Sequence, residues 1–328
     1  MDFLEMGRFY EKLAEKSLSF FKKDFKSAGY WYSSAADCYR IGEDEEKFLD
    51  LKNLALKYFL SLLEEPKEKG IVDSIGQIYL WVSYAYRALG NLDEHRNFLI
   101  KAAKTFALQA KSLDKGDKAP LQAIINYYNS ANCYRILGDR SRAEENYKNA
   151  LKIYYQKGIS KGIEFSPVLL ASCHYRLGDI KKAVEILEKE SKKHNLPPLV
   201  FSNINLILGC YYLKEGKEEE ARKHFEEARI PPDTERLSAP ELVTQALCQL
   251  MLNNAENATG LAEVSIRLSS KLRDYNLRQL IHEIGELILS LVRGQEQKIE
   301  VLMESLTWQH MELPLYDALN IITRKRSQ

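Results

Sequence analysis

The sequence predicts an all-α protein: a right-handed solenoid of helical hairpins followed by a C-terminal helical bundle. The first observation is that a Tyr-rich helical segment ends at a glycine five times in the first two thirds of the chain. The second is the spacing of these glycines, which follow one another at intervals of 48, 48, 40 and 38 residues: Gly42, Gly90, Gly138, Gly178 and Gly216. Self-similarity at such a period is typical of stacked supersecondary units, each of which buries its apolar face against its neighbours.

The first element is an amphipathic helix, and a loop rich in phenylalanine and lysine follows it. Aromatic side chains flanked by cations suit insertion into an anionic membrane surface. The same phenylalanines also suit packing under the first helix pair, and the sequence leaves both interpretations open. The residues of this candidate membrane loop are Phe20, Phe21, Lys22, Lys23 and Phe25.

The third hairpin shows the repeat most clearly. Its two helices carry the small residues Ala131 and Ala143, which allow close approach, and Tyr147 fills the space toward the next pair. Gly138 can adopt the left-handed conformation that ends the first helix, and Asp139 can cap the second. These features resemble the tetratricopeptide repeat, a helix-turn-helix of 34 residues.

The other hairpins vary this pattern. The spacings exceed 34 residues, so we expect long helices, such as 45–63 and 71–89, each about 28 Å long. The second small residue is kept in the last three repeats, but Lys47 and His95 replace it in the first two. We therefore expect those two hairpins to be splayed.

The segment after Pro232 lacks the Tyr-Gly turn signature but still predicts amphipathic helices, over 239–253, 255–272, 277–292, 297–306 and 314–323. We expect these helices to form a bundle that covers the last open repeat face, as terminal caps do. The predicted domains are a solenoid over 1–236 and a bundle over 237–328.

Composition excludes several classes of function. The chain has 328 residues, 45% of them hydrophobic and 28% charged, with a net charge of +1. A near-neutral chain is a poor fit to nucleic acid, since phosphate neutralisation needs a basic surface. The start of the sequence does not resemble a signal peptide, and no apolar run reaches the ~20 residues of a spanning helix. We expect a cytoplasmic protein. If the candidate membrane loop inserts into lipid, the protein would also bind peripherally to a membrane.

No catalytic chemistry is predicted, so we expect a non-enzyme without cofactor or metal. The six histidines lack ligand spacing, and His282 has no second histidine of a zinc protease motif. The sequence contains no Gly-rich phosphate loop or nucleophile elbow. The five cysteines are dispersed and form no CxxC pair, which favours reduced thiols serving as small apolar residues at helix contacts.

A basic residue recurs near the end of the first helix of each hairpin. Stacked in register, these cations would form a basic track that attracts an acidic partner. A local explanation competes with this one, since cations are also favoured at the C-terminal end of any helix. The residues are Arg40, Arg87, Arg135, Arg176 and Lys214.

The whole chain resembles the soluble NSF attachment proteins (SNAPs), which are adaptors for SNARE disassembly. The similarity lies in the first helix and its Ser-Phe-Phe loop, in the segments SAGYWYSSAA at 27–36 and QALCQL at 245–250, and in the ending LTWQHMELPLYD at 306–317. SNAPs end in an acidic tail, whereas this chain carries Arg324, Lys325 and Arg326 there.

The resemblance implies an adaptor that binds a coiled-coil, SNARE-type bundle, touches membrane through the Phe20/Phe21 loop and recruits an AAA+ ATPase of the NSF type. The three C-terminal cations are then candidate ATPase contacts. The alternative is a general tetratricopeptide scaffold with a soluble protein partner, which requires only the repeat.

Overall fold

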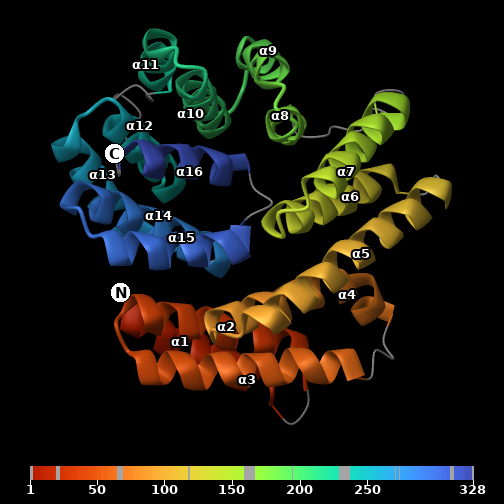
Figure 1. The fold of residues 1–328 in the computed structure, drawn as a ribbon. Helices are drawn as coiled ribbons and strands as arrows, with labels where there is room; N and C mark the ends of the chain where they lie inside the picture. Colours follow the sequence, from red (N-terminus) through yellow and green to blue (C-terminus); the bar gives the residue numbers. More distant parts are fainter. Residues whose placement is uncertain are drawn as a thin grey trace. The chain divides into compact units, whose positions relative to one another are not determined.

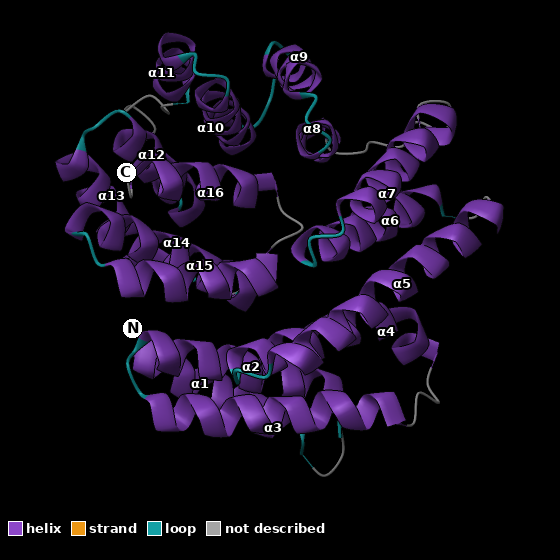
Figure 2. Cartoon of the chain, viewed as in Figure 1, coloured by secondary structure: helices purple, strands orange, loops and turns teal. Residues whose placement is uncertain are grey.

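The computed structural model describes residues 3–19, 23–64, 69–116, 119–158, 167–193, 195–228, 237–269, 271–272, 274–310 and 314–326. All regular secondary structure in these ranges is helical, as Figure 2 shows, which confirms the all-α helical-hairpin class. The chain divides into two compact units, Met1–Ile163 (unit 1) and Glu164–Gln328 (unit 2), and each is described by itself.

Unit 1 consists of a leading helix and three hairpins of consecutive helices (Figure 1). Helix α7 continues into a short π-helical turn, η1. The helices are α1 (Phe3–Ser17), α2 (Phe25–Ile41), α3 (Glu45–Glu64), α4 (Lys69–Ala88), α5 (Leu92–Gly116), α6 (Pro120–Ile136), α7 (Arg140–Ile153) and η1 (Tyr154–Gly158).

Unit 2 contains four more hairpins among its described residues, followed by a last helix that packs on α8, α10 and α15. Its helices are α8 (Pro167–Arg176), α9 (Ile180–Ser191), α10 (Pro198–Lys214), α11 (Glu218–Glu227), α12 (Ala239–Met251), α13 (Ala255–Ser269), α14 (Tyr275–Arg293), α15 (Glu296–His310) and α16 (Pro314–Arg326). The helices predicted for the C-terminal third are therefore all present.

One backbone motif joins the two helices of each hairpin. A residue in the left-handed conformation follows the first helix, and the next N–H donates to a carbonyl five residues earlier, at 2.8–3.0 Å. This is the Schellman ending of a helix. The left-handed residues follow one another at intervals of 37 to 48 residues and are Glu43, Gly90, Gly138, Gly178, Gly216, Asn253 and Gly294.

These turns correct the predicted register in two places. In the first hairpin Gly42 has φ −82°, and Glu43 at φ 65° takes the left-handed position instead. In the C-terminal third the turn signature is not lost, because Asn253 and Gly294 form the same turn before α13 and α15. Asparagine tolerates the left-handed conformation better than most residues and can take the place of the glycine. A search for Tyr-Gly segments therefore misses the turn at Asn253.

The predicted boundary at 236/237 falls inside unit 2, between α11 and α12. Helix α10 contacts α12 and α16, and α11 contacts α12, so hairpins from both sides of the boundary pack together in this unit. The division into a solenoid and a bundle stays a prediction.

At several helix contacts a glycine faces a bulky side chain of the neighbouring helix. A Cβ placed on Gly29 of α2 would lie 2.6 Å from the ring of Phe59 in α3. On Gly209 of α10 it would lie 2.4 Å from the ring of Phe225 in α11. The prediction that the first two hairpins are splayed is therefore wrong for α2 and α3, since their contact uses Gly29 in place of the predicted small pair.

The second hairpin also closes without the predicted small residue. Ser83, which is fully buried in α4, donates a hydrogen bond from Oγ to the backbone carbonyl of His95 in α5 at 2.8 Å. The same Oγ lies 2.8 Å from His95 Nδ1. The larger imidazole is accommodated because it is polar and bonds the facing serine.

All five cysteines are buried and none forms a disulfide, as the sequence predicted. Cys38, Cys133, Cys173 and Cys248 each precede a left-handed residue by five positions. Burial raises the pKa of the Cys173 thiol to about 12, so this side chain stays protonated and unreactive. The repeat uses cysteine as a small apolar residue where the first helix packs on the second.

Candidate protein-interaction surfaces

In unit 1, three of the predicted basic residues share one turn position. Arg40, Arg87 and Arg135 each lie three residues before a left-handed residue, near the C-terminal ends of α2, α4 and α6. Arg40 and Arg87 are half-buried, with the Arg40 guanidinium 5.1 Å from the centre of the Phe48 ring. Arg135 is exposed, and it forms no ion pair with another described residue. We call these three residues the arginine edge.

In unit 2, the two remaining members of the predicted track occupy a different position. Arg176 and Lys214 lie two residues before a left-handed glycine, which turns them by about 100° around the helix relative to the arginine edge. Arg176 points inward: its side chain is 2% exposed, and it donates to both carboxylate oxygens of Asp317 in α16, at 2.9 and 3.1 Å. Ser172 donates to the same carboxylate at 2.9 Å. Lys214 is exposed.

Arg176 therefore ties α16 to α8, and its charge is already matched inside unit 2. A bidentate arginine–carboxylate pair with a further hydroxyl donor is a strong, directional contact. Its burial means that removal of one partner alone leaves a charge uncompensated. This pairing was not predicted from the sequence, because 141 residues separate Asp317 from Arg176.

The three C-terminal cations have three different environments. Arg324 and Lys325 are exposed, and Lys325 forms an ion pair with Glu218 of α11 at 2.8 Å. Arg326 is partly buried, and loss of solvent lowers the pKa of its guanidinium. Lys325 and Arg326 line one pocket of unit 2, whereas Arg324 lines another.

Part of the predicted membrane loop lies outside the described residues, namely Phe20, Phe21 and Lys22. Lys23 is exposed, with φ 37°. Phe25 begins α2, and its ring stacks on Tyr58 of α3 at a centroid distance of 5.6 Å while the residue keeps 37% of its surface exposed. None of the described helices combines the length and apolar composition that crossing a bilayer requires.

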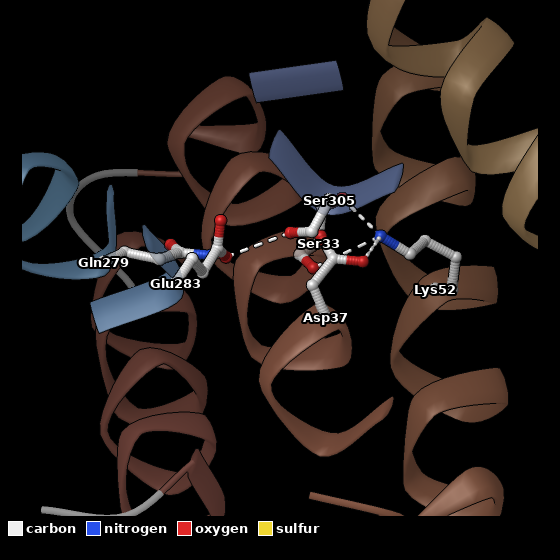
Figure 3. Close-up of polar contacts among 6 residues, drawn as sticks. All are labelled: Ser33, Asp37, Lys52, Gln279, Glu283 and Ser305. Carbon is white, nitrogen blue, oxygen red and sulfur yellow. Dashed lines mark hydrogen bonds and ion pairs between the residues drawn. The ribbon is translucent and has the colours of Figure 1, made fainter. Parts of the chain in front are cut away.

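Two buried polar clusters were not predicted, and Figure 3 shows both. In unit 1 the ammonium group of Lys52 in α3 is buried and donates to Asp37 Oδ1 at 2.8 Å and to Ser33 Oγ at 2.9 Å, both in α2. The pairing supplies the hydrogen bonds that a buried charge requires. The cluster fixes α3 against α2 and leaves Lys52 unexposed to any partner.

The second cluster lies in unit 2 around Glu283, which is fully buried in α14. Its Oε1 accepts a hydrogen bond from Gln279 Nε2 at 2.8 Å and another from Ser305 Oγ of α15 at 2.9 Å (Figure 3). Both clusters join the two helices of one hairpin, which is a structural arrangement. No group of three or more metal-binding side chains occurs in the part of the chain that the structure describes.

Comparison with known families agrees with the hairpin geometry. Residues 125–157 and 202–228 match the tetratricopeptide repeat family model. The first range covers most of α6, all of α7 and most of η1, and the second covers most of α10 and all of α11. The match thus includes the third hairpin, which the sequence showed most clearly. No curated protein matches the chain.

The chain is also similar to several solved structures, at low sequence identity and with TM-scores below 0.5. BtubC from P. vanneervenii is 19% identical with a TM-score of 0.45, over 73% of this chain and 97% of that one. NprR in complex with its cognate peptide NprX is 17% identical with a TM-score of 0.40, over 92% and 83%. The Cut9–Hcn1 hetero-tetramer of APC/C is 13% identical with a TM-score of 0.29, over 100% and 67%.

Proposed function

We propose that this protein is a scaffold that binds an acidic segment of a partner protein along the arginine edge of unit 1. The supporting observation is the recurrence of arginine at one turn position on three consecutive hairpins of a single compact unit. Repeat proteins use such extended surfaces to hold other proteins, and a row of like charges steers an oppositely charged partner.

The burial of each arginine refines the proposal. Arg135 is exposed and has no ion-pair partner among the described residues, so its guanidinium is accessible to an incoming carboxylate. Arg40 and Arg87 are half-buried, which pre-orders their side chains and lowers the entropic cost of holding a ligand. We expect Arg135 to contribute most to attraction and Arg87 most to orientation.

A charge-matched pair of variants tests the arginine edge. The first is Arg87→Gln/Arg135→Gln. The second is Arg140→Gln/Arg142→Gln, which removes the same charge from α7, where the two side chains are 89% and 60% exposed. Purified wild type and both variants are used to capture proteins from a cognate lysate, and the captured proteins are quantified by mass spectrometry.

We expect a partner that the wild type and the α7 variant retain and that the arginine-edge variant loses. Equal loss from both variants would show that only overall charge matters. Full retention by both would place the binding surface elsewhere in the protein. Thermal melting of each variant separates loss of binding from loss of fold.

The narrower prediction is a SNAP-type adaptor for SNARE bundles and an NSF-type ATPase. None of the matches supports it, and it stays a second proposal. Its membrane part is tested by liposome flotation of the wild type and a Phe20→Ser/Phe21→Ser variant, where equal recovery contradicts it. Its partner part is tested by whether an AAA+ ATPase is captured in the lysate experiment.

A further inference from the structure

A pocket in unit 2 lies outside the arginine edge and includes two of the three predicted C-terminal cations, Lys325 and Arg326. It has a volume of about 400 Å³ and lies where the ends of α10, α12 and α16 meet the start of α11. Its apolar lining comes from Leu213, Phe225, Met251 and Leu252. The rest of the lining is polar and consists of Asn253 and the charged side chains of Glu218, Glu219, Arg222, Lys325 and Arg326. A concave space in which apolar side chains and charged groups converge is typical of a site for a ligand.

Three cations and two carboxylates line the pocket, and they are unevenly paired. Of the carboxylates, Glu219 is exposed to solvent. Lys325 is held by Glu218 at 2.8 Å, and Arg222 pairs with Glu226, which does not line the pocket, at 3.1 Å. Arg326 also lines the pocket, yet it has no ion-pair partner among the described residues. Its pKa is lowered because its guanidinium has lost solvent. A cation in this position gains more from an incoming carboxylate than an exposed one does, since the pair forms with less competition from water.

We propose that this pocket binds an acidic peptide segment of a partner, with an aliphatic side chain on the Met251–Leu252 lining and a neighbouring carboxylate on Arg326. The apolar lining supplies affinity through burial, and the guanidinium supplies direction and charge selectivity. This site lies in unit 2 and is separate from the arginine edge of unit 1, so the two proposals stand or fall independently.

The probe is the capped peptide Leu-Glu-Leu-Glu, titrated against full-length protein carrying ¹³C-methyl methionine. Met251 lines the pocket, whereas Met6 is buried in α1 of unit 1 and serves as an internal reference. A Met251→Leu variant assigns the reporter signal. The capped peptides Leu-Lys-Leu-Lys and Ser-Glu-Ser-Glu test the carboxylate and the aliphatic group separately.

A pair of variants on one helix isolates the cation. Arg326→Gln and Arg324→Gln remove the same charge from α16, but only Arg326 lines this pocket. We expect the Leu-Glu-Leu-Glu peptide to shift the Met251 signal with the Met6 signal unchanged. We expect Arg326→Gln to weaken its binding at least tenfold and Arg324→Gln to weaken it less than twofold.

Three results would overturn the proposal. An unmoved Met251 signal up to millimolar peptide means that the pocket does not bind this class of ligand. Equal weakening by the two variants means that attraction is long-range only. Equal binding of the lysine peptide means that the carboxylate is not recognised. The Arg324→Gln variant, which leaves the pocket lining intact, also shows whether loss of charge on α16 alters its folding.

Discussion

Replacement of Gly209 by alanine tests the glycine–aromatic contact that sets the distance between α10 and α11. A Cβ at this position would lie 2.4, 2.7 and 2.8 Å from three atoms of the Phe225 ring, whereas ordinary contacts begin at 3.4 Å. The ring must therefore retreat by about 1 Å. It is 2% exposed, and closely packed interiors have little room for such a shift.

The size of the effect follows from two opposing contributions. Overpacking a buried contact costs about 1–3 kcal/mol. Alanine in place of glycine inside a helix returns about 1 kcal/mol through its better helix propensity. Gly260 in α13 provides the matched control, because it is exposed and a Cβ there meets nothing within 4 Å. Gly260→Ala should stabilise the protein by about 1 kcal/mol, and Gly209→Ala should be less stable than that control by about 1–3 kcal/mol.

Urea unfolding followed by circular dichroism gives the difference between the two variants, and hydrogen exchange with mass spectrometry locates it. Loss of amide protection in α10 and α11 is expected for Gly209→Ala alone. A Gly209→Ala/Phe225→Leu double variant should be more stable than the two single effects predict, because the smaller side chain removes the clash. If Gly209→Ala stabilised the protein as much as Gly260→Ala does, the ring would not lie against this backbone.

Three further predictions address a buried pair, a titration and a turn. Asp37→Ala should cost about 3–5 kcal/mol in urea unfolding, since it leaves the Lys52 ammonium group buried and uncompensated, and an Asp37→Leu/Lys52→Met variant should regain most of that loss. Burial lowers the pKa of His174 and His224. The unfolded chain therefore binds protons more readily than the folded one below about pH 6.5, so the free energy of unfolding should fall from about pH 7.5 to about pH 5.5. A His174→Tyr/His224→Phe variant should reduce that fall, and an unchanged fall would assign it to other groups. Gly138→Ala should lower the free energy of unfolding by about 1 kcal/mol, because the residue at this position has φ 77°. Gly138→Asn should lower it less, since asparagine tolerates this conformation. Equal melting temperatures of the two variants would contradict this expectation.

The sequence predicted the hairpin class because its signal is local. A glycine after a helical segment, an aspartate at the next helix start and small residues at the contact all act within one turn or one helix pair. Asp139 confirms the predicted cap, since its side chain accepts a hydrogen bond from the Arg142 N–H at 3.1 Å. The same local signal placed the helices of the C-terminal third, although their turns were not recognised.

The unrecognised turns show that the repeat is conserved in backbone geometry and varies in residue identity. Glu43 and Asn253 adopt the left-handed conformation without being glycine, at φ 65° and 61°. In both turns the following N–H closes the same hydrogen bond to the carbonyl five residues earlier. A pattern defined by Tyr and Gly therefore shifts the first hairpin by one residue and passes over the hairpin of α12 and α13.

Long-range contacts set the limit of prediction for the surfaces. The sequence places Arg135 and Arg176 at near-equivalent points of two repeats, each directly after a tyrosine, but their environments differ. Arg135 is exposed, whereas Arg176 turns inward to Asp317 on a helix far along the chain. Only the fold of unit 2 shows this carboxylate next to Arg176. A basic track predicted from the sequence alone therefore includes a residue that is not available at the surface.

The inward turn of Arg176 also explains why the two units carry different candidate surfaces. In unit 2 the pair with Asp317 holds α16 against α8, and the far end of α16 brings Lys325 and Arg326 to the pocket beside α11 and α12. A cation that would otherwise serve as a surface charge is used to place the helix that completes the pocket. In unit 1 Arg135 is not used in this way and stays exposed. Lys214 has the same turn position as Arg176 and is exposed, so the carboxylate of Asp317, and not the turn position alone, makes Arg176 a structural arginine.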